Sequence, residues 1–364
     1  MRFHISSLSL SILAVMTTAA FAQGETQETA LSQVLPTLQF EAQDADDKAA
    51  YAAKTASAVL RSDAPLFETA QSISVISEKQ LEQKQAKTLS EALQGVAGVT
   101  AGQYGRRGWD DFIIRGQISS SQTYIDGLRI QASDNVLRAE DISGLESIEV
   151  VKGPTSVGFG LALPGGLVNL TTKRPQAETA YKCTLSFGSY GLKEGTFDLN
   201  YAPNNTDKGA FRVVGRVSDQ DDPTDYVYFK NFYISPSYHF DLGDKADLSV
   251  IASYQHRKYM RQQGIPVIGT LKYNPNGPID RDLYIGEPEF GGYEGDVYRT
   301  GWTYNYNFDN GWKFTQNAAI QKLQSTGRVV FTQTGSSFWA ANTPAYTTLN
   351  RSNNGRYQTH DITT

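Results

Sequence analysis

The second half of the chain is dominated by segments in which apolar and polar residues alternate. Phe197, Leu199 and Tyr201, for example, are separated by single polar residues. Successive side chains of a strand point to opposite faces, so a period of two predicts strands with one apolar and one polar face. We expect about eight or nine such strands after residue 177, because turn sequences such as Asp309-Asn310-Gly311 separate the segments. The clearest segments are 182–187, 197–201, 211–217, 232–240, 248–254, 302–308 and 312–314.

Two architectures fit this alternation. A soluble sandwich has one wet and one packed face, whereas a transmembrane barrel turns its apolar face to lipid and carries aromatic residues at both interfaces. Aromatic residues such as Tyr306 and Phe308 end several segments, which favours the barrel. A plugged barrel of about 22 strands, at about 10 residues a strand, needs roughly 220 residues. Residues 177–364 are therefore expected to be the first strands of an antiparallel β-barrel in a longer protein; a closed barrel of about eight strands is the alternative.

Residues 61–176 have a mixed helix and strand pattern. Ser77 with Gln80, and Thr88 with Glu91, have the spacing of capping boxes that begin helices. The second of these helices has apolar residues at helical spacing, at Leu89, Ala92, Leu93 and Val96. Asp126-Gly127 between apolar pairs predicts a tight hairpin. With short strands expected at 73–75, 112–114, 147–151 and 166–171, and a glycine-rich loop over 153–166, this part is expected to be a compact mixed α/β domain.

The N-terminus has the features of a secretory signal. Arg2 and His4 precede an apolar run over 5–16, and Ala20-Phe21-Ala22 supplies a small-residue cleavage site before Gln23. A buried first helix is the alternative to a signal peptide over residues 1–22. Residues 23–60 are polar and almost free of aromatic residues, a composition that predicts a flexible tail.

Composition excludes several classes of protein. The net charge is −5 and no basic stripe stands out, which argues against nucleic acid as a partner. Mean hydropathy is −0.40, and no stretch after the N-terminus is apolar enough for a membrane-spanning helix. Cys183 is the single cysteine, so no disulfide forms within the chain, and we interpret it as a small apolar residue of a strand.

Signals of catalysis or metal binding are weak. The glycine-rich segment 153–160 lacks the Gly-Lys-Ser/Thr of a phosphate loop. Asp110 and Asp111 are adjacent in a predicted strand, so their side chains point to opposite faces. The histidines lie outside the α/β domain, at His4, His239, His256 and His360. We therefore expect neither an enzyme nor a resident metal or cofactor.

The α/β domain resembles the plug domain of TonB-dependent siderophore receptors. Any one of its motifs alone is weak, but six follow one another in family order over residues 64–176. They are residues 71–77, Leu93–Val99 with Ala97 where proline is usual, Arg107–Gly116, Tyr124–Leu128, Leu145–Pro154 and Pro164–Pro175. The resemblance implies a plug domain over 61–176 inside a barrel of the 22-strand class, in the outer membrane of a Gram-negative bacterium.

The resemblance assigns a function to a short apolar segment of the predicted tail. Residues 35–42 resemble the TonB box, a segment that adds a strand to the periplasmic protein TonB; they are Leu35, Pro36, Thr37, Leu38, Gln39, Phe40, Glu41 and Ala42. Main-chain hydrogen bonds give such a pairing its strength, so the requirement for particular side chains is loose. The expected partners are TonB, of the TonB–ExbB–ExbD complex, outer-membrane lipid and a ferric siderophore, which brings its own iron. A tail segment without a partner is the alternative.

The resemblance also assigns roles to residues of the domain. Arg115 and Lys152 match family positions whose cations pair with acidic groups on the barrel wall. The residues expected to face the siderophore are Arg106, Arg107, Trp109, Ser121 and Gln122, because arginine donors, amides and aromatic faces suit a ligand with oxygens and apolar rims. A receptor for haem, cobalamin or a saccharide is the nearest alternative function. A passive barrel or an exported binding module, with no energy coupling, is a more distant one.

Overall fold

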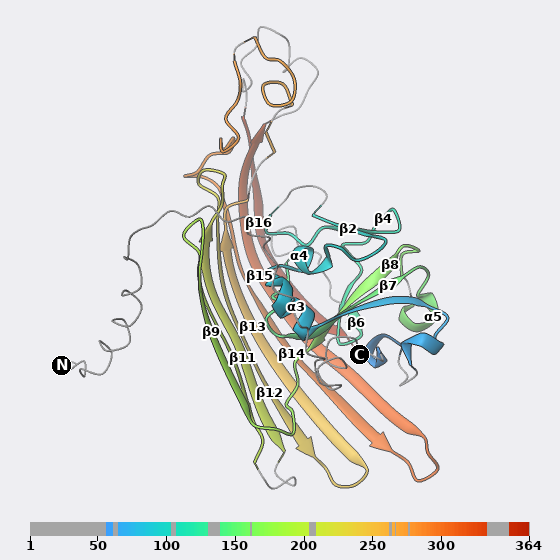
Figure 1. The fold of residues 1–364 in the computed structure, drawn as a ribbon. Helices are drawn as coiled ribbons and strands as arrows, with labels where there is room; N and C mark the ends of the chain where they lie inside the picture. The colour runs from blue at the N-terminus through green and yellow to red at the C-terminus, as the bar shows by residue number, and fades with distance from the viewer. Residues whose placement is uncertain are drawn as a thin grey trace, which may run out of the picture. The chain divides into compact units, whose positions relative to one another are not determined.

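The computed structural model describes residues 56–60, 65–102, 107–129, 139–160, 162–203, 209–261, 264–265, 267–275, 277–332 and 349–363. The signal peptide predicted over 1–22 and the TonB box predicted over 35–42 lie outside these residues, as do residues 23–55 of the predicted tail. The last residues of that predicted tail, 56–60, include a short helix whose Val59 is buried against Tyr124, Val151 and Leu167 of the small domain. No helix within the described ranges is long and apolar enough to cross a membrane. Two kinds of structure follow one another along the chain, a small α/β domain and then a large antiparallel sheet (Figure 1).

The small domain, whose last strand ends at Thr172, holds two sheets and several short helices. Its five-stranded sheet has the order β1-β7-β8-β5-β6, antiparallel except for the parallel pair β5 and β8. A second sheet contains β2, β3 and β4. The strands are β1 (Ser72–Ser77), β2 (Val99–Ala101), β3 (Phe112–Ile114), β4 (Gln117–Ile118), β5 (Thr123–Ile125), β6 (Leu128–Arg129), β7 (Leu145–Lys152) and β8 (Gly166–Thr172). The helices are α2 (Ser57–Leu60), the 3-10 helix η1 (Leu66–Glu68), α3 (Glu78–Lys84), α4 (Leu89–Leu93) and α5 (Ser156–Phe159).

Local sequence signals explain several of these elements. The predicted capping box is present at α3, where Ser77 and Gln80 exchange both hydrogen bonds. At α4 the prediction is only half right: Thr88 accepts from the Glu91 amide, but the Glu91 carboxylate accepts from the Lys87 amide, 2.7 Å away, and not from Thr88. Asp126 and Gly127 both have positive φ between β5 and β6, which is the backbone of the predicted tight hairpin.

The core of the small domain lies between its sheets and helices. Leu89, Ala92 and Leu93 of α4 are buried there, as the helical spacing predicts, with β-strand residues such as Phe112 and Ile148. Val96, predicted on the same helical face, packs against this core from beyond the end of α4. The glycine-rich loop contains α5, a helix that the sequence pattern did not predict.

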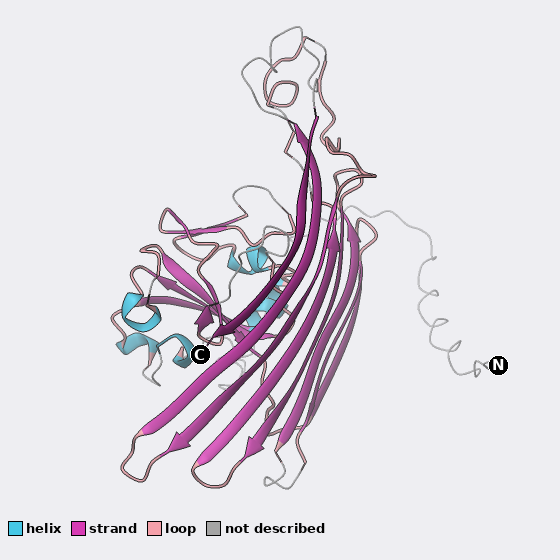
Figure 2. Ribbon diagram, turned by 180° about the vertical axis from the view of Figure 1, so that it is seen from behind, coloured by secondary structure: helices cyan, strands magenta, loops and turns pink. Residues whose placement is uncertain are grey.

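The large sheet is an up-and-down meander of eight antiparallel strands. Each strand pairs with the next along the chain, in the order β16-β15-β14-β13-β12-β11-β10-β9, so β9 and β16 are its edges among the described residues. Figure 2 shows the strands running side by side in one curved sheet. The strands are β9 (Ala180–Phe187), β10 (Lys193–Tyr201), β11 (Ala210–Asp221), β12 (Tyr228–Asp241), β13 (Ala246–Tyr259), β14 (Gly292–Asn307), β15 (Lys313–Thr332) and β16 (Leu349–Thr363).

The connections of this sheet differ between its two ends. Short turns over residues 242–245 and 308–312 join strands at one end. At the opposite end, residues 260–291 form a long connection between β13 and β14. We call this the long-loop end. Long loops at one end and short turns at the other are typical of outer-membrane barrels.

In a soluble protein the apolar face of a sheet is buried and the polar face is exposed, but in this sheet the apolar face is exposed and the polar face is buried. Large apolar side chains lie exposed on one face, with Leu185 77% and Phe187 76% exposed. Polar side chains such as Arg212, only 4% exposed, are buried on the other face. Cys183 lies exposed on β9, in line with Leu185 and Phe187. A soluble sandwich buries its apolar face, so this arrangement confirms the predicted fold class, a mixed α/β domain followed by barrel strands.

Candidate functional site

An aromatic cluster joins the small domain to the large sheet at the long-loop end. Trp109, just before β3, is buried against Tyr259 of β13, Tyr293 of β14 and Leu323 of β15. Its indole N–H donates to the hydroxyl oxygen of Tyr259, 2.9 Å away. The rings of Tyr259 and Tyr293 stack with centroids 5.1 Å apart. Trp109 therefore anchors the small domain to three strands of the sheet.

Gly108 makes this close approach possible. Its φ is +88°, and a Cβ atom added to it would lie 2.9 Å from the ring of Phe229 and 3.1 Å from that of Tyr259. Glycine adopts such a backbone without strain and leaves room for both rings. The Arg-Gly-Trp sequence thus places an arginine and a tryptophan at the sheet while the backbone between them touches it.

Three arginines surround the aromatic cluster. The guanidinium of Arg261 lies 4.7 Å from the centre of the Trp109 ring, and that of Arg257 lies 5.3 Å from the Tyr259 ring. Arg107 forms an ion pair with Asp222 and donates to the Thr224 hydroxyl at 3.3 Å. Cations over aromatic faces and next to hydroxyl groups can bind the oxygen atoms of a ligand.

A second, smaller cluster continues this surface into the connections between strands. Val227, Met260 and Tyr284 pack together, and the Tyr284 hydroxyl donates to the Met260 sulfur at 3.1 Å. The Tyr226 ring lies 6.3 Å from that of Tyr284 and is exposed. The aromatic packing thus continues beyond the Trp109 cluster, and Tyr226 presents an exposed ring at its border.

The structure describes four of the five residues predicted to face a ligand, and it separates them. Arg107 and Trp109 come together at the long-loop end, while Arg106 lies outside the described residues. Ser121 is exposed at the end of a turn. Gln122 is 2% exposed, and its side-chain carbonyl accepts from the Leu163 amide at 3.4 Å. This contact connects Gln122 to the glycine-rich loop, so its side chain serves the internal packing of the small domain.

Arg115 and Lys152 were predicted to pair with acidic residues of the barrel wall. Neither forms an ion pair with any residue of the described ranges. Arg115 is exposed. The pKa of Lys152 is lowered by the partial burial of its side chain and, to a smaller extent, by the charge of Arg115. A role in pairs with a barrel carboxylate stays a prediction for both residues.

Ion pairs between the small domain and the sheet lie elsewhere, on β10 and β11. Glu194 of β10 binds Arg216 of β11 at 2.7 Å and also Lys87 of the small domain. Four residues further along β10, Asp198 binds Arg212 of β11 at 2.7 Å and Lys173 at 2.9 Å. Each sheet carboxylate is therefore shared between a sheet arginine and a lysine from outside the sheet. We call these two groups the Glu194 pair group and the Asp198 pair group.

The alternation of polar and apolar residues indicates these groups only in part. Residues four apart in a strand share a face, so the inward positions of Glu194 and Asp198, and of Arg212 and Arg216, follow from the alternation. Which arginine meets which carboxylate depends on the register, in which Asp198 lies opposite Val214 and Arg216 opposite Thr196. The alternation does not determine this register.

Asp110 is a buried acid within the contact between the small domain and the sheet. Burial raises the pKa of Asp110 to about 7, although its carboxylate accepts from the Glu140 amide at 2.9 Å and feels the charge of Arg257. Asp111 beside it is 3% exposed. Desolvation outweighs these favourable contacts, so Asp110 changes charge near neutral pH.

Comparisons with known proteins agree on the fold of this chain. Residues 65–167 match the family described as "TonB-dependent Receptor Plug Domain". The ferrioxamine B receptor of Salmonella typhimurium is 29% identical over 259 residues, which cover 69% of this chain and 37% of that receptor. The ferrichrome outer membrane transporter/phage receptor of Escherichia coli is 25% identical over 289 residues, 78% of this chain and 39% of the transporter.

Solved structures show the same architecture. The closed form of the ferric-catecholate import receptor Fiu from Escherichia coli superimposes with a TM-score of 0.72 at 23% identity, over 86% of this chain and 45% of that receptor. The chain thus spans less than half the length of each of these relatives.

Proposed function

We propose that this chain, which belongs to the TonB-dependent siderophore receptor family, takes part in TonB-dependent uptake of a ferric siderophore across the outer membrane of a Gram-negative bacterium. The relatives are named as receptors and transporters of ferrioxamine, ferrichrome and catecholate siderophores. In this proposal the small domain is the plug, the large sheet is part of the barrel wall, and the long-loop end faces the outside of the cell.

One observation carries the proposal: a folded domain is bound to the polar face of a sheet whose other face is apolar. The apolar face is suited to lipid. The polar face binds the plug through the Glu194 and Asp198 pair groups and the Trp109 cluster. A passive barrel needs no such domain in its lumen, whereas a receptor that takes up a tightly bound ligand needs a closed pore and a way to open it.

Energy coupling follows from the affinity that scarce iron requires. A nanomolar complex corresponds to about −12 kcal/mol. With an on-rate near about 10⁶ M⁻¹ s⁻¹, it releases its ligand only at about 10⁻³ s⁻¹. The outer membrane has no ATP supply of its own. We propose that TonB, in the TonB–ExbB–ExbD complex, binds residues 35–42 by strand addition and pulls on the plug.

The ligand is expected to meet the plug at the long-loop end. Arg107 and Trp109 lie there together with Arg261 and the exposed ring of Tyr226. A ferric siderophore has oxygen atoms around its iron and apolar edges. Arginine donors and aromatic faces suit both features.

Uptake of radioactive iron tests this function. Cells that lack the receptor gene would be complemented either with the gene or with a variant that lacks residues 38–40, and supplied with single ferric siderophores. We expect uptake of at least one siderophore with the intact gene. The deletion is expected to abolish uptake and to leave binding to the cell surface unchanged. Uptake that survives the deletion would refute energised transport, and no uptake of any siderophore would refute the substrate class.

A further inference from the structure

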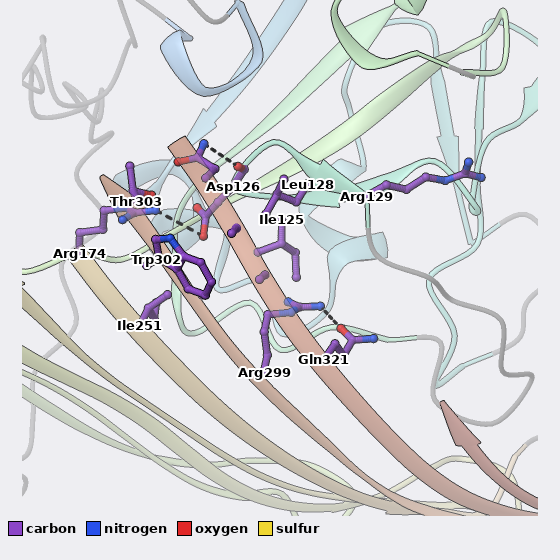
Figure 3. Close-up of a pocket in the computed structure, with 14 residues that line it drawn as sticks. Ile125, Asp126, Leu128, Arg129, Arg174, Ile251, Arg299, Trp302, Thr303 and Gln321 are labelled. Carbon is purple, nitrogen blue, oxygen red and sulfur yellow. Dashed lines mark hydrogen bonds and ion pairs between the residues drawn. The ribbon is translucent and has the colours of Figure 1, made fainter. Parts of the chain in front are cut away.

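The contact between the plug and the wall of β12 to β15 leaves little room beyond the Trp109 cluster. The cavities there are only about 40 and 30 Å³. Figure 3 shows side chains that line this space: Asp126 pairs with Arg174 at 3.6 Å, and Arg299 of β14 binds Gln321 of β15. Pockets for small molecules usually have volumes on the order of 300 Å³ or more. A ferric siderophore on this side of the plug must therefore bind nearer the connections of the long-loop end.

One of these connections, residues 222–227 between β11 and β12, is bound to the plug. Arg107 forms an ion pair with Asp222 and donates to the Thr224 hydroxyl at 3.3 Å. The Asp222 carboxylate also accepts from the Thr224 amide at 2.9 Å, and the Val227 amide donates to the Thr224 carbonyl at 3.2 Å. Arg107 thus binds the two residues that close this connection into a turn.

The same connection is also joined to the long connection between β13 and β14. The Asp225 amide donates to the Asp282 carbonyl at 2.8 Å. Val227 is buried together with Met260 and Tyr284. The connection between β11 and β12 is therefore held from two directions, by the plug and by its neighbour on the wall.

Tyr226 is the aromatic side chain that this connection exposes. Thr224 and Val227 are buried, whereas Tyr226 is 66% exposed. Its φ of +61° lies in the left-handed region, which bulky residues rarely adopt. Such strain persists only where surrounding contacts enforce it, and it is concentrated at functional sites. The bonds of Arg107 and Asp225 are contacts of this kind.

The two plug residues of this site already have partners. Trp109 is 8% exposed and donates to the Tyr259 hydroxyl. The Arg107 guanidinium uses Nε and Nη2 to bind Asp222 and Thr224. Both side chains would have to leave these partners to bind a ligand, but the exposed ring of Tyr226 would not.

We infer that the Tyr226 ring packs against an apolar edge of the ferric siderophore, and that Arg107 is a positioning residue, which holds this ring in place through Asp222 and does not bind the ligand itself. This inference rests on the proposed function and refines the role of Arg107 in it. A ring that is fixed before binding loses little conformational freedom when the ligand arrives, which favours affinity.

The two possible roles of Arg107 give opposite results when Asp222 is changed. If Arg107 were a ligand donor, loss of the Asp222 charge would free it for the ligand. If Arg107 positions Tyr226, the same loss weakens binding. Asp222→Asn suits this test, because asparagine keeps an oxygen for the Thr224 amide and removes the charge that holds Arg107.

Binding to the whole receptor tests the inference. Ferrioxamine B, ferrichrome and an iron catecholate, each with radioactive iron, would be offered singly to cells that express the whole gene. The compound that binds most tightly would be the probe. Its dissociation constant would be measured for Tyr226→Ala, Arg107→Ala, Asp222→Asn and the double variant of Arg107→Ala with Tyr226→Ala.

Tyr190→Ala is the matched control. Tyr190 is also exposed, and its φ is +56°. Its turn between β9 and β10 is held by a different bond, from the Asp221 amide to the Tyr190 carbonyl at 2.9 Å. We expect Tyr190→Ala to bind the probe as tightly as the unchanged receptor.

We expect each single change at Tyr226, Arg107 or Asp222 to weaken binding about tenfold, and the double variant to weaken it about tenfold as well, because both changes remove one contact. Weakening of the double variant by about a hundredfold, or unchanged or tighter binding in Asp222→Asn, would overturn the positioning role. Unchanged binding in Tyr226→Ala, or equal weakening in Tyr190→Ala, would overturn the role of the ring. If the unchanged receptor bound none of the three compounds, this would instead count against the proposed function.

Amide hydrogen exchange tests the positioning role without a ligand. In the purified receptor we expect the amides of Thr224 and Val227 to exchange about tenfold faster in Arg107→Ala, because their turn loses its bond to the plug. Exchange in residues 188–192, the turn of Tyr190, should stay the same. If exchange of Thr224 and Val227 were also unchanged, the connection would hold itself without Arg107, and the inference would be overturned.

Discussion

Replacement of Trp109 tests the anchor between plug and wall. In Trp109→Ala the plug loses a large buried side chain, its hydrogen bond to Tyr259 and its contact with Arg261. Truncation of a buried aromatic residue costs about 3–5 kcal/mol. Trp109→Phe keeps an aromatic ring and loses mainly the hydrogen bond, a loss of about 1 kcal/mol.

Amide hydrogen exchange measures this loss. We expect exchange in β2 and β3 of the whole receptor to become about a thousandfold faster in Trp109→Ala, the ratio for about 4 kcal/mol, and about fivefold faster in Trp109→Phe. Phe67→Ala is the control, because Phe67 is an aromatic plug residue that is fully exposed. If Trp109→Ala changed exchange no more than Phe67→Ala, the role of Trp109 as an anchor would be refuted.

Three further predictions concern charge, backbone and lipid contact. The pKa of Asp110 is raised from 3.8 to about 7, so between these pH values the folded state binds a proton that the unfolded state has lost. The stability of the plug should therefore fall by about 2 kcal/mol from pH 5 to 7. Hydrogen exchange should show this fall, and Asp110→Asn should remove it. Gly166→Ala should destabilise the plug by about 2 kcal/mol or more, because φ is +132° and the new Cβ atom would overlap the Val151 carbonyl oxygen. Gly158→Ala, where the new Cβ atom meets open space, should not destabilise it. Limited proteolysis compares the two variants. Val213 shares a face of β11 with the exposed Phe211. Val213→Arg should therefore cost the barrel about 2–4 kcal/mol, whereas Thr196→Arg, beside the space between the plug and β10, should not. The heat-modifiable gel shift of the folded barrel measures both.

The sequence was most informative where a feature depends on a few neighbouring residues. The cap at Ser77 and the hairpin at Asp126-Gly127 were predicted correctly, because each is determined by local hydrogen bonds or by backbone angles that glycine allows. The alternation of the barrel strands was also predicted. It reports which face each side chain takes, and the faces agree with the exposed Leu185 and the buried Arg212.

Features that depend on distant residues were not predictable in this way. β14 begins at Gly292, ten residues before the segment 302–308 predicted for it, because hydrogen bonds to β13 and β15 extend it where the alternation fades. The Glu194 pair group needs the register of two strands and the position of Lys87 on the plug. Gln122 was predicted to face a ligand because an amide suits the oxygens of a siderophore. Its burial depends on a contact with Leu163 of the glycine-rich loop, 41 residues away, which the local sequence does not reveal.

The proposal of energised uptake is tested most directly by uptake in the same cells before and after a protonophore removes the proton-motive force. Binding of the ferric siderophore to the cell surface is measured in parallel. We predict that binding persists and that uptake stops, because a plug that remains against the barrel wall keeps the pore closed without a pull on its tail. Uptake that continues at its original rate without the proton-motive force would contradict the account.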